Sequence, residues 1–240
     1  MDRTELAARN NAEWCDAVCA AHGLPGVITS DVWLQKQPGP PYYSNAVTLS
    51  RDGIPAQIDA VEALIAARPE GFSIKDSFAT LDLSGRGFSV LFEAEWLWLD
   101  PSKPLPPAEE TWEQVTSGGA LIAWEAAWAE SSPRENRVFP PVLLADDRIA
   151  FLGARRGDRF VAGAIANRST GEVCGFSNFF APGEAIAQFR QDAVNAVRTF
   201  AEGRPLVAYD RGEELEGLRS LGLEETGGLR VWLREGAAGS

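Results

Sequence analysis

Cysteine, histidine and arginine side chains are the first candidates for chemistry in this sequence. Cys15, Cys19 and His22 follow the spacing i, i+4, i+7, which places three metal-ligand types on one face of a helix. A closed zinc site needs a fourth ligand, and the sequence offers no other histidine and only the remote Cys174. We interpret the three residues as core packing plus a histidine near a helix end, and we expect no metal.

Cys174 and three arginines are the remaining candidates. Cys174 has no histidine near it in the sequence to activate it as a nucleophile, so a core position is the better interpretation. Arg155, Arg156 and Arg159 surround a hairpin turn, where they either steer a diphosphate or lie in a solvated turn. Neither group identifies a reaction by itself.

Charge and composition exclude several classes of partner. The chain has 240 residues, with 22 Lys and Arg against 34 Asp and Glu, a formal net charge of −12 and 45% hydrophobic residues. This composition is typical of a globular protein, and the acid excess disfavours nucleic acid and anionic membrane surfaces. A small anionic cofactor stays compatible, because a helix N-terminus or a few local arginines can hold it.

The N-terminus and the cysteine content predict a cytoplasmic protein. Met1–Glu5 does not begin an apolar segment typical of a signal peptide, and no run of about 18 apolar residues is present to span a bilayer. The 3 cysteines are odd in number and sparse, which favours a reducing compartment over a disulfide framework.

A proline-rich segment divides the chain. Residues 101–111 contain four prolines, which disfavour a helix or a central strand and favour an extended linker. We therefore expect one lobe at 1–100, a second at 112–235 and a disordered tail at 236–240.

Hydrophobic periodicity and turn residues predict helices and strands in both lobes. In the N-terminal lobe we expect helices at 4–22 and 55–67 and strands at 27–37, 44–49, 72–78 and 89–99. In the C-terminal lobe we expect a weak strand near Val115, helices at 120–130, 188–201 and 213–221, and strands at 149–154, 159–167, 172–180, 205–209 and 224–234. This order predicts an α+β fold of the mixed α/β type, with a mostly antiparallel sheet flanked by helices in each lobe.

Short matches at a nearly constant offset indicate an internal repeat. Residues 43–45 match residues 176–178, and residues 59–64 match residues 192–197, both at an offset of 133. Two further matches, one at a glycine and one at a tryptophan, keep almost the same spacing. We interpret the chain as a tandem duplication with a degenerate N-terminal copy, and the alternative is two unrelated α+β lobes.

The C-terminal order of elements resembles the GCN5-related N-acetyltransferase (GNAT) family. The C-terminal lobe and the family share one order of elements: a helix, three antiparallel strands, a long helix, a strand, a short helix and a last strand. Residues Leu218–Glu225 look like the family's ending, in which a helix runs into Gly-Phe and the final strand. Since the N-terminal half repeats the later part of this order, the whole chain is similar to tandem GNAT proteins with a degenerate first lobe.

The resemblance implies a site for acetyl-CoA or another acyl-CoA. In the family a splayed strand pairs with the pantetheine, and the next helix begins Gln/Arg-x-x-Gly-x-Gly/Ala, with amides that hold the pyrophosphate. The nearest match is Gln188–Ala193, where Gln191 replaces the glycine and Asp192 adds a negative charge. The alternative is that this helix only covers the sheet. The residues implied to bind the cofactor are Phe179, Phe180, Ala181, Gly183, Gln188, Arg190 and Gln191.

The catalytic groups implied by the resemblance are partly replaced. Leu218 stands where the family often has a tyrosine that protonates the leaving thiolate, so Tyr209, at the end of a strand, is the nearest substitute. Glu172 and Asp210 are candidate bases for the amine, and for both the alternative is a solvated surface carboxylate.

The function implied is an acyl-CoA-dependent N-acyltransferase, with acetyl-CoA as the expected donor and a small-molecule amine as the acceptor. The alternative is a catalytically inactive GNAT-fold protein that binds a metabolite or a protein partner. A third hypothesis, an aminoacyl-tRNA-dependent transferase, is disfavoured by the net charge. We expect no nucleic acid and no membrane partner, and we leave a homodimer open.

Overall fold

The computed structural model of this chain describes residues 2–68, 70–130 and 137–236. The chain divides into two compact units, one made of the residues up to Trp96 together with those from Thr226 onward, and the other of Leu97–Glu225. Of the predicted tail at 236–240, all residues except Gly236 lie outside the described part of the chain.

The strands of the first unit follow the order β1-β2-β3-β4-β11. The pair β3–β4 is parallel, and the pairs β1–β2, β2–β3 and β4–β11 are antiparallel. These strands are β1 Val27–Ile28, β2 Val32–Leu34, β3 Ala46–Thr48, β4 Gly71–Asp76 and β11 Glu224–Glu235, and β5, Ser89–Leu99, begins in the same unit.

The first unit contains the C-terminal strand of the chain. Residues Arg230–Glu235 of β11 pair antiparallel with Gly71–Asp76 of β4. Residues from Thr226 onward therefore belong to the same compact unit as the beginning of the chain. In the prediction from sequence, residues up to 235 belong to the second lobe.

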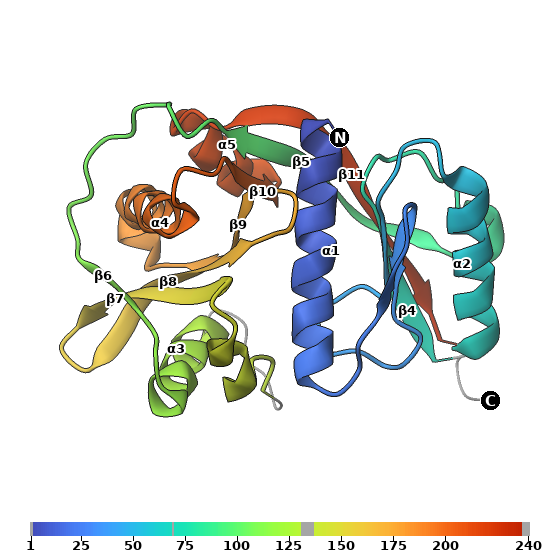
Figure 1. Cartoon of the computed structure of the whole chain (residues 1–240), viewed down its shortest axis with the longest axis horizontal. Helices are drawn as coiled ribbons and strands as arrows, with labels where there is room; N and C mark the ends of the chain where they lie inside the picture. Colours follow the sequence, from blue (N-terminus) through green and yellow to red (C-terminus); the bar gives the residue numbers. More distant parts are fainter. Residues whose placement is uncertain (1, 69, 131–136, 237–240) are drawn as a thin grey trace. The chain divides into compact units, whose positions relative to one another are not determined.

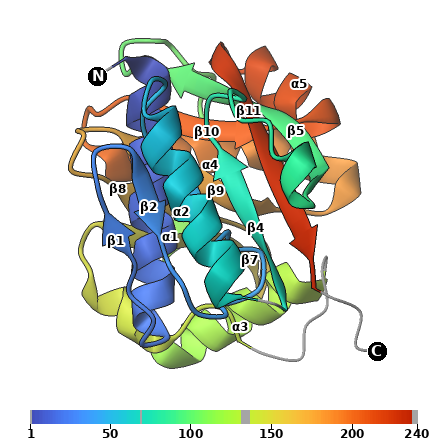
Figure 2. The same ribbon diagram turned by 90° about the vertical axis from the view of Figure 1, so that its right-hand side faces the viewer.

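Two helices cover opposite faces of the first unit's sheet. Helix α1, Arg3–Ala21, begins at a capping box formed by Asp2 and Glu5, and α2, Ile54–Ala67, has a proline in its first turn. Adjacent residues of β3 alternate, so that Ala46 packs in the cluster of α2 and Val47 in the cluster of α1. Figure 1 shows the sheet between the two helices, and in Figure 2 α2 lies in front of the strands.

The second unit has the strand order β10-β9-β8-β7-β6. All neighbours are antiparallel except β9 and β10, which run parallel. The prediction of a mixed α/β fold with mostly antiparallel strands is confirmed. The elements are β6 Trp112–Gln114, α3 Gly118–Glu130, β7 Ile149–Arg156, β8 Arg159–Arg168, β9 Cys174–Phe180, α4 Ile186–Ala201, β10 Leu206–Asp210 and α5 Gly212–Ser220, with 3₁₀ turns at Ser84–Arg86, Pro141–Ala145 and Gly183–Ala185.

The core of the second unit lies on both faces of its sheet. On one face Ala193 and Val197 of α4 pack against strand residues such as Ala164 and Leu206. On the other face Trp124 of α3 is fully buried and donates its indole N–H to the Leu152 carbonyl oxygen at 2.8 Å. The Trp124 ring also meets Phe180 edge to face, with centroids 5.2 Å apart. Helices α3 and α4 therefore hold the sheet between them (Figure 1).

Several predicted strands have different bounds in the structure, and the segment at 27–37 and the start of the strand at 172–180 are two of them. The segment 27–37 is a hairpin, because the Thr29 hydroxyl accepts the backbone N–H groups of Asp31 and Val32 and closes a turn there. Glu172 was expected on a strand, but it lies in the turn before β9 with φ of 60°.

The three cysteines are free and buried, as the core interpretation predicted. Burial raises the pKa of Cys15 to about 11 and those of Cys19 and Cys174 to about 12. Such thiols stay protonated at neutral pH and are poor nucleophiles. Among the described residues, no group of three or more His, Cys, Asp or Glu is placed to hold a metal ion.

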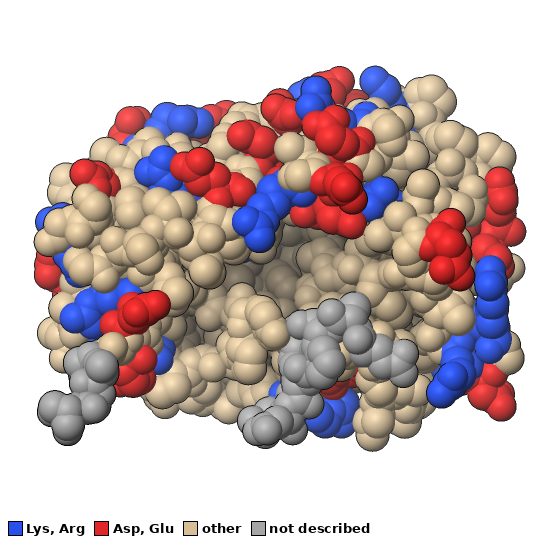
Figure 3. All heavy atoms as spheres, turned by 180° about the vertical axis from the view of Figure 1, so that it is seen from behind, with Lys and Arg blue, Asp and Glu red and all other residues tan. Residues whose placement is uncertain are grey.

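The distribution of surface charge and the character of the helices are relevant to nucleic-acid and membrane partners. On the face shown in Figure 3, acidic and basic side chains are interspersed along the upper edge. No helix in the described part of the chain combines the length and the apolar character that crossing a bilayer requires.

Candidate functional site

The parallel strands β9 and β10 separate toward their carboxyl ends. In the described residues their pairing consists of Cys174 with Leu206 and Gly175 with Val207. Beyond these pairs, β9 continues to Phe180 and β10 to Asp210 without a common ladder. The backbone N–H and C=O groups along this edge of β9 are therefore available to an extended ligand. We call this space the β9–β10 opening.

A β-bulge in β9 accompanies the separation. Ser177 pairs with Ile165 and Phe180 pairs with Gly163, so β9 has one more residue than β8 over this stretch. The residue between them that takes the left-handed conformation is Asn178, with φ of 53°. A bulge bends its strand and increases its twist, which turns the end of β9 away from β10.

Helix α4 begins next to the end of β9 with its first amides uncapped by any described side chain. A 3₁₀ turn that starts at Gly183 leads into it, and a Cβ added at Gly183 would meet open space. The Ile186 N–H donates to the Gly183 carbonyl oxygen, and the other N–H groups of the first turn and the helix dipole make this end suitable for an anion.

Gln191 and Asp192 of the predicted pyrophosphate loop bind the proline-rich segment, and Gln188 binds Asp192. The Gln191 amide donates to the Pro107 carbonyl oxygen at 2.9 Å, and the Gln188 amide donates to the Asp192 carboxylate at 3.2 Å. Asp192 is fully buried and accepts the backbone N–H groups of Glu109 and Glu110 at 2.9 and 3.1 Å. Its negative charge is thus directed at the 101–111 segment, and Gln191 does not block the end of α4.

Two further side chains of α4 hold the same segment. Asn195 donates to the Pro106 carbonyl oxygen at 2.9 Å, and Arg198 donates to the Lys103 carbonyl oxygen at 2.7 Å. The proline-rich segment is consequently fastened along one side of α4.

Arg190 is buried beside the β9–β10 opening. Its guanidinium donates to the Glu214 carboxylate of α5 at 2.5 Å and lies 5.6 Å above the centre of the Phe179 ring. Gly217 leaves the room for it, because a Cβ there would overlap the guanidinium. The Arg190 Nε is buried and has no hydrogen-bond partner in the described part of the chain. This cation is therefore held at the opening by one carboxylate and one ring.

Asp210 is the titratable group most perturbed at this end of the sheet. Burial raises its pKa to about 6, and the nearby Glu214 carboxylate adds to the rise. The backbone N–H of Arg211, which donates to it at 3.0 Å, and the charges of Arg190 and Arg211 lower it in part. A carboxylate with this pKa is ionised at neutral pH and is a stronger base than a solvated one. Asp210 is therefore partly buried at the end of β10, and its role as a base stays a prediction.

The two residues predicted as catalytic lie at opposite ends of the sheet. Tyr209 is half-buried at the end of β10, next to Asp210 and facing the opposite side of the sheet. Glu172 is exposed in the turn that precedes β9, so the length of β9 separates it from the opening. The structure brings Tyr209 to the opening and does not bring Glu172 there.

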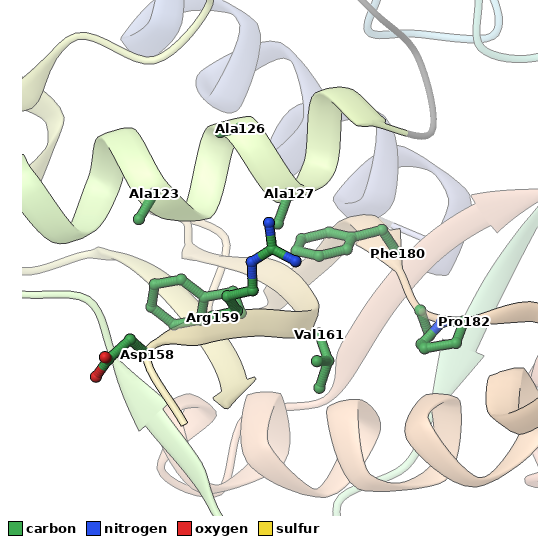
Figure 4. Close-up of a pocket in the computed structure, with 10 residues that line it drawn as sticks. Ala123, Ala126, Ala127, Asp158, Arg159, Val161, Phe180 and Pro182 are labelled. Carbon is green, nitrogen blue, oxygen red and sulfur yellow. The ribbon is translucent and has the colours of Figure 1, made fainter. Parts of the chain in front are cut away.

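Phe180 and Ala181 border a pocket on the α3 side of the sheet (Figure 4). Phe180 lies over Gly163, where a Cβ would overlap both its ring and the Trp124 indole nitrogen.

We predict that Gly163→Ala lowers the free energy of unfolding by about 1–3 kcal/mol, because the added methyl group overlaps the Phe180 ring and the Trp124 indole, which is held by its hydrogen bond to Leu152. Gly119→Ala is the matched control, since nothing lies within 4 Å of its Cβ position on α3. Urea denaturation of both variants tests this; equal stability of the two would contradict the described packing.

Sequence reasoning missed Glu214 and Gly217. Both belong to α5, which a helical pattern locates correctly, but nothing in their spacing indicates that Arg190 would reach them.

Comparison with known proteins supports the fold. A GCN5-related N-acetyltransferase from Kribbella flavida aligns with a TM-score of 0.65 and 17% identity over 96% of both chains. A conserved protein of unknown function from Staphylococcus epidermidis aligns with a TM-score of 0.61 and 14% identity, over 88% of this chain and 93% of that one. A GCN5-related N-acetyltransferase from Sphaerobacter thermophilus gives a TM-score of 0.53 and 11% identity, over 98% of this chain and 95% of that one. No protein-family model and no curated protein matches the chain.

Proposed function

We propose that this chain, which has the fold of the GCN5-related N-acetyltransferases, is an acyl-CoA-dependent N-acyltransferase. The donor is acetyl-CoA and the acceptor is a small-molecule amine. The observation that carries the proposal is the β9–β10 opening, formed by two parallel strands that part after Gly175 and Val207. A site of this form suits an extended, amide-containing ligand.

The residues at the opening suit the parts of acyl-CoA. The edge of β9 from Phe176 to Phe180 offers backbone groups to the pantetheine amides, and the first amides of α4 offer donors to the pyrophosphate. Of the residues implied by the resemblance, Phe179, Phe180, Ala181 and Gly183 line this path, and the side chains of Gln188 and Gln191 support it through the proline-rich segment. Arg190 adds a positive charge beside the path.

Two protein groups at the end of β10 supply the proton transfers. The Asp210 carboxylate takes a proton from the amine as its nitrogen attacks the thioester carbonyl carbon, directly or through one water. Tyr209 gives a proton to the departing thiolate. The two side chains face opposite sides of the sheet, and both stand at the end of β10 that borders the opening. A backbone N–H of β9 polarises the carbonyl oxygen.

The first unit is proposed to be a degenerate copy without a site of its own. It also has a parallel pair, β3 and β4, joined by a helix, α2. However, the buried Gln57 side chain near the start of α2 donates to the Ser50 and Asp31 carbonyl oxygens, which ties that end to neighbouring loops. A cytoplasmic location forms part of the proposal, because it agrees with the free cysteines.

Calorimetry with acetyl-CoA tests the proposal. We expect saturable binding that Gly183→Glu weakens about tenfold, because a carboxylate at the start of α4 repels the phosphates. Gly183→Gln is the control of matching size and should bind as the parent does, since the position faces open space.

Absence of binding at millimolar acetyl-CoA would reject the enzymatic proposal and favour the inactive alternative. Equal affinities of the Glu and Gln variants would reject the role of α4.

A further inference from the structure

The second unit has a pocket of about 550 Å³ between α3 and the ends of β8 and β9. This size is within the range of small-molecule sites. Phe180, Ala181 and Pro182 form the wall that it shares with the end of β9. A ligand in the pocket therefore reaches the strand that borders the β9–β10 opening.

The walls of the pocket are mostly apolar and are shaped by irregular backbone. Three alanines on one face of α3, at positions 123, 126 and 127, leave space that longer side chains would fill. A bulge in β8 leaves Val161 unpaired between the pairs Ala154–Ala162 and Arg155–Phe160, and the β9 bulge lies on the adjacent strand. Bulges on both strands redirect the side chains at the pocket, as they often do beside binding sites.

Arg159 is the cation of this pocket. Its neighbours in the hairpin are paired, since Arg155 donates to Glu113 at 2.5 Å and Arg156 lies 3.6 Å from Glu110. The exposed Arg159 side chain has no ion pair or hydrogen bond within the described ranges. In Figure 4 its guanidinium lies beside the Phe180 ring and Ala127, whereas the Asp158 carboxylate points away from it.

We infer that the pocket binds the acceptor through a carboxylate, and that the acceptor is an amine with an apolar body, such as an apolar amino acid. This inference rests on the proposed acyl transfer. Arg159 holds the carboxylate with charge-assisted hydrogen bonds, the alanine face and Phe180 surround the apolar part, and the amine is directed toward the opening. There the nitrogen forms a bond to the acyl carbon, the carbon–sulfur bond breaks, the amine proton goes to Asp210, and the thiolate takes a proton from Tyr209.

Acetylation of leucine, leucinamide and isopentylamine by the full chain tests this inference. We expect leucine to have a kcat/KM about 10- to 100-fold above that of the two compounds without a carboxylate. Arg159→Gln should remove this preference and leave the KM for acetyl-CoA unchanged. Arg156→Gln, in the same hairpin but outside the pocket, is the matched control and should keep the preference.

Calorimetry with N-acetylleucine and N-acetylleucinamide separates this inference from the proposed function. Binding of the carboxylate form that depends on Arg159 supports the pocket even when acetyl-CoA does not bind. Equal use of leucine and leucinamide by an active enzyme overturns the inference and leaves the acyl transfer standing. A rise in the KM for acetyl-CoA in Arg159→Gln also overturns it, because Arg159 would then bind the donor.

Discussion

Asp210→Asn is expected to lower kcat/KM for amine acetylation by about 10²- to 10⁴-fold, the range typical of a lost general base. The physical reason is the environment of the carboxylate at the end of β10, where burial and Glu214 raise its pKa to about 6. An amide of the same shape keeps the packing but cannot take the proton. Steady-state kinetics at saturating acetyl-CoA measures the effect.

The pH profile gives this prediction a sharper form. A base must be ionised, so kcat/KM should rise with pH below about 6 and the rise should end near that value in the parent enzyme. Glu214→Gln removes a carboxylate that raises the pKa of Asp210, so the rise of kcat/KM with pH should move to lower pH. Arg190→Gln removes a cation that lowers this pKa, so the same rise of kcat/KM should move to higher pH.

The stability of the Asp210→Asn variant distinguishes the loss of the base from unfolding of the protein. Because the pKa of Asp210 is raised in the folded protein, its ionisation at neutral pH opposes folding, and this effect grows as pH rises from the ordinary value toward 6. Asp210→Asn should therefore be at least as stable as the parent at pH 7. Full activity of a folded Asp210→Asn protein would remove Asp210 from the mechanism, and an unchanged turnover of Tyr209→Phe would do the same for Tyr209.

Asp192→Ala is expected to lower the free energy of unfolding by about 3 kcal/mol. The Asp192 carboxylate is fully buried and accepts three hydrogen bonds, two of them from backbone N–H groups of the proline-rich segment. Removing it leaves these donors without an acceptor and releases the segment from α4. Equilibrium denaturation in urea measures the loss.

Gln191→Ala is the matched comparison, because its side chain makes one exposed hydrogen bond to the same segment. We expect it to cost about 0.5–1.5 kcal/mol at most. Equal losses in the two variants would mean that the Asp192 carboxylate holds the segment no better than an exposed amide does.

Most elements of this fold can be predicted from local patterns. The strand at 89–99 is observed with those bounds, and the helix at 188–201 begins two residues earlier, at Ile186. These segments have clear periodicity and clear ends, so neighbours in the sequence determine them. The hairpin at 27–34 was harder, because its turn depends on one threonine hydroxyl inside an alternating pattern.

The candidate site was only partly predictable. The end of β10 and the start of α4 follow from the order of the elements, so the places of Tyr209 and Gly183 in the chain's elements could be predicted, whereas their roles stay predictions. The directions of the side chains do not follow from that order. Gln191 turns to Pro107, and Asp210 is partly buried at the end of β10, near the charges of Glu214 on α5 and Arg190 on α4. Burial and pairing over such separations arise from tertiary packing, which a local pattern does not contain.

The pairing of β11 with β4 also has a consequence during synthesis on the ribosome. About 130 residues separate Trp96 from Thr226, where the first unit resumes. At roughly 5–20 residues per second, translation takes about 7–26 s to supply the missing strand. During that interval the edge of β4 that will receive β11 has no strand from its own chain beside it, and such edges promote association between chains. The nascent first unit therefore has an unpaired strand edge until the last strand emerges.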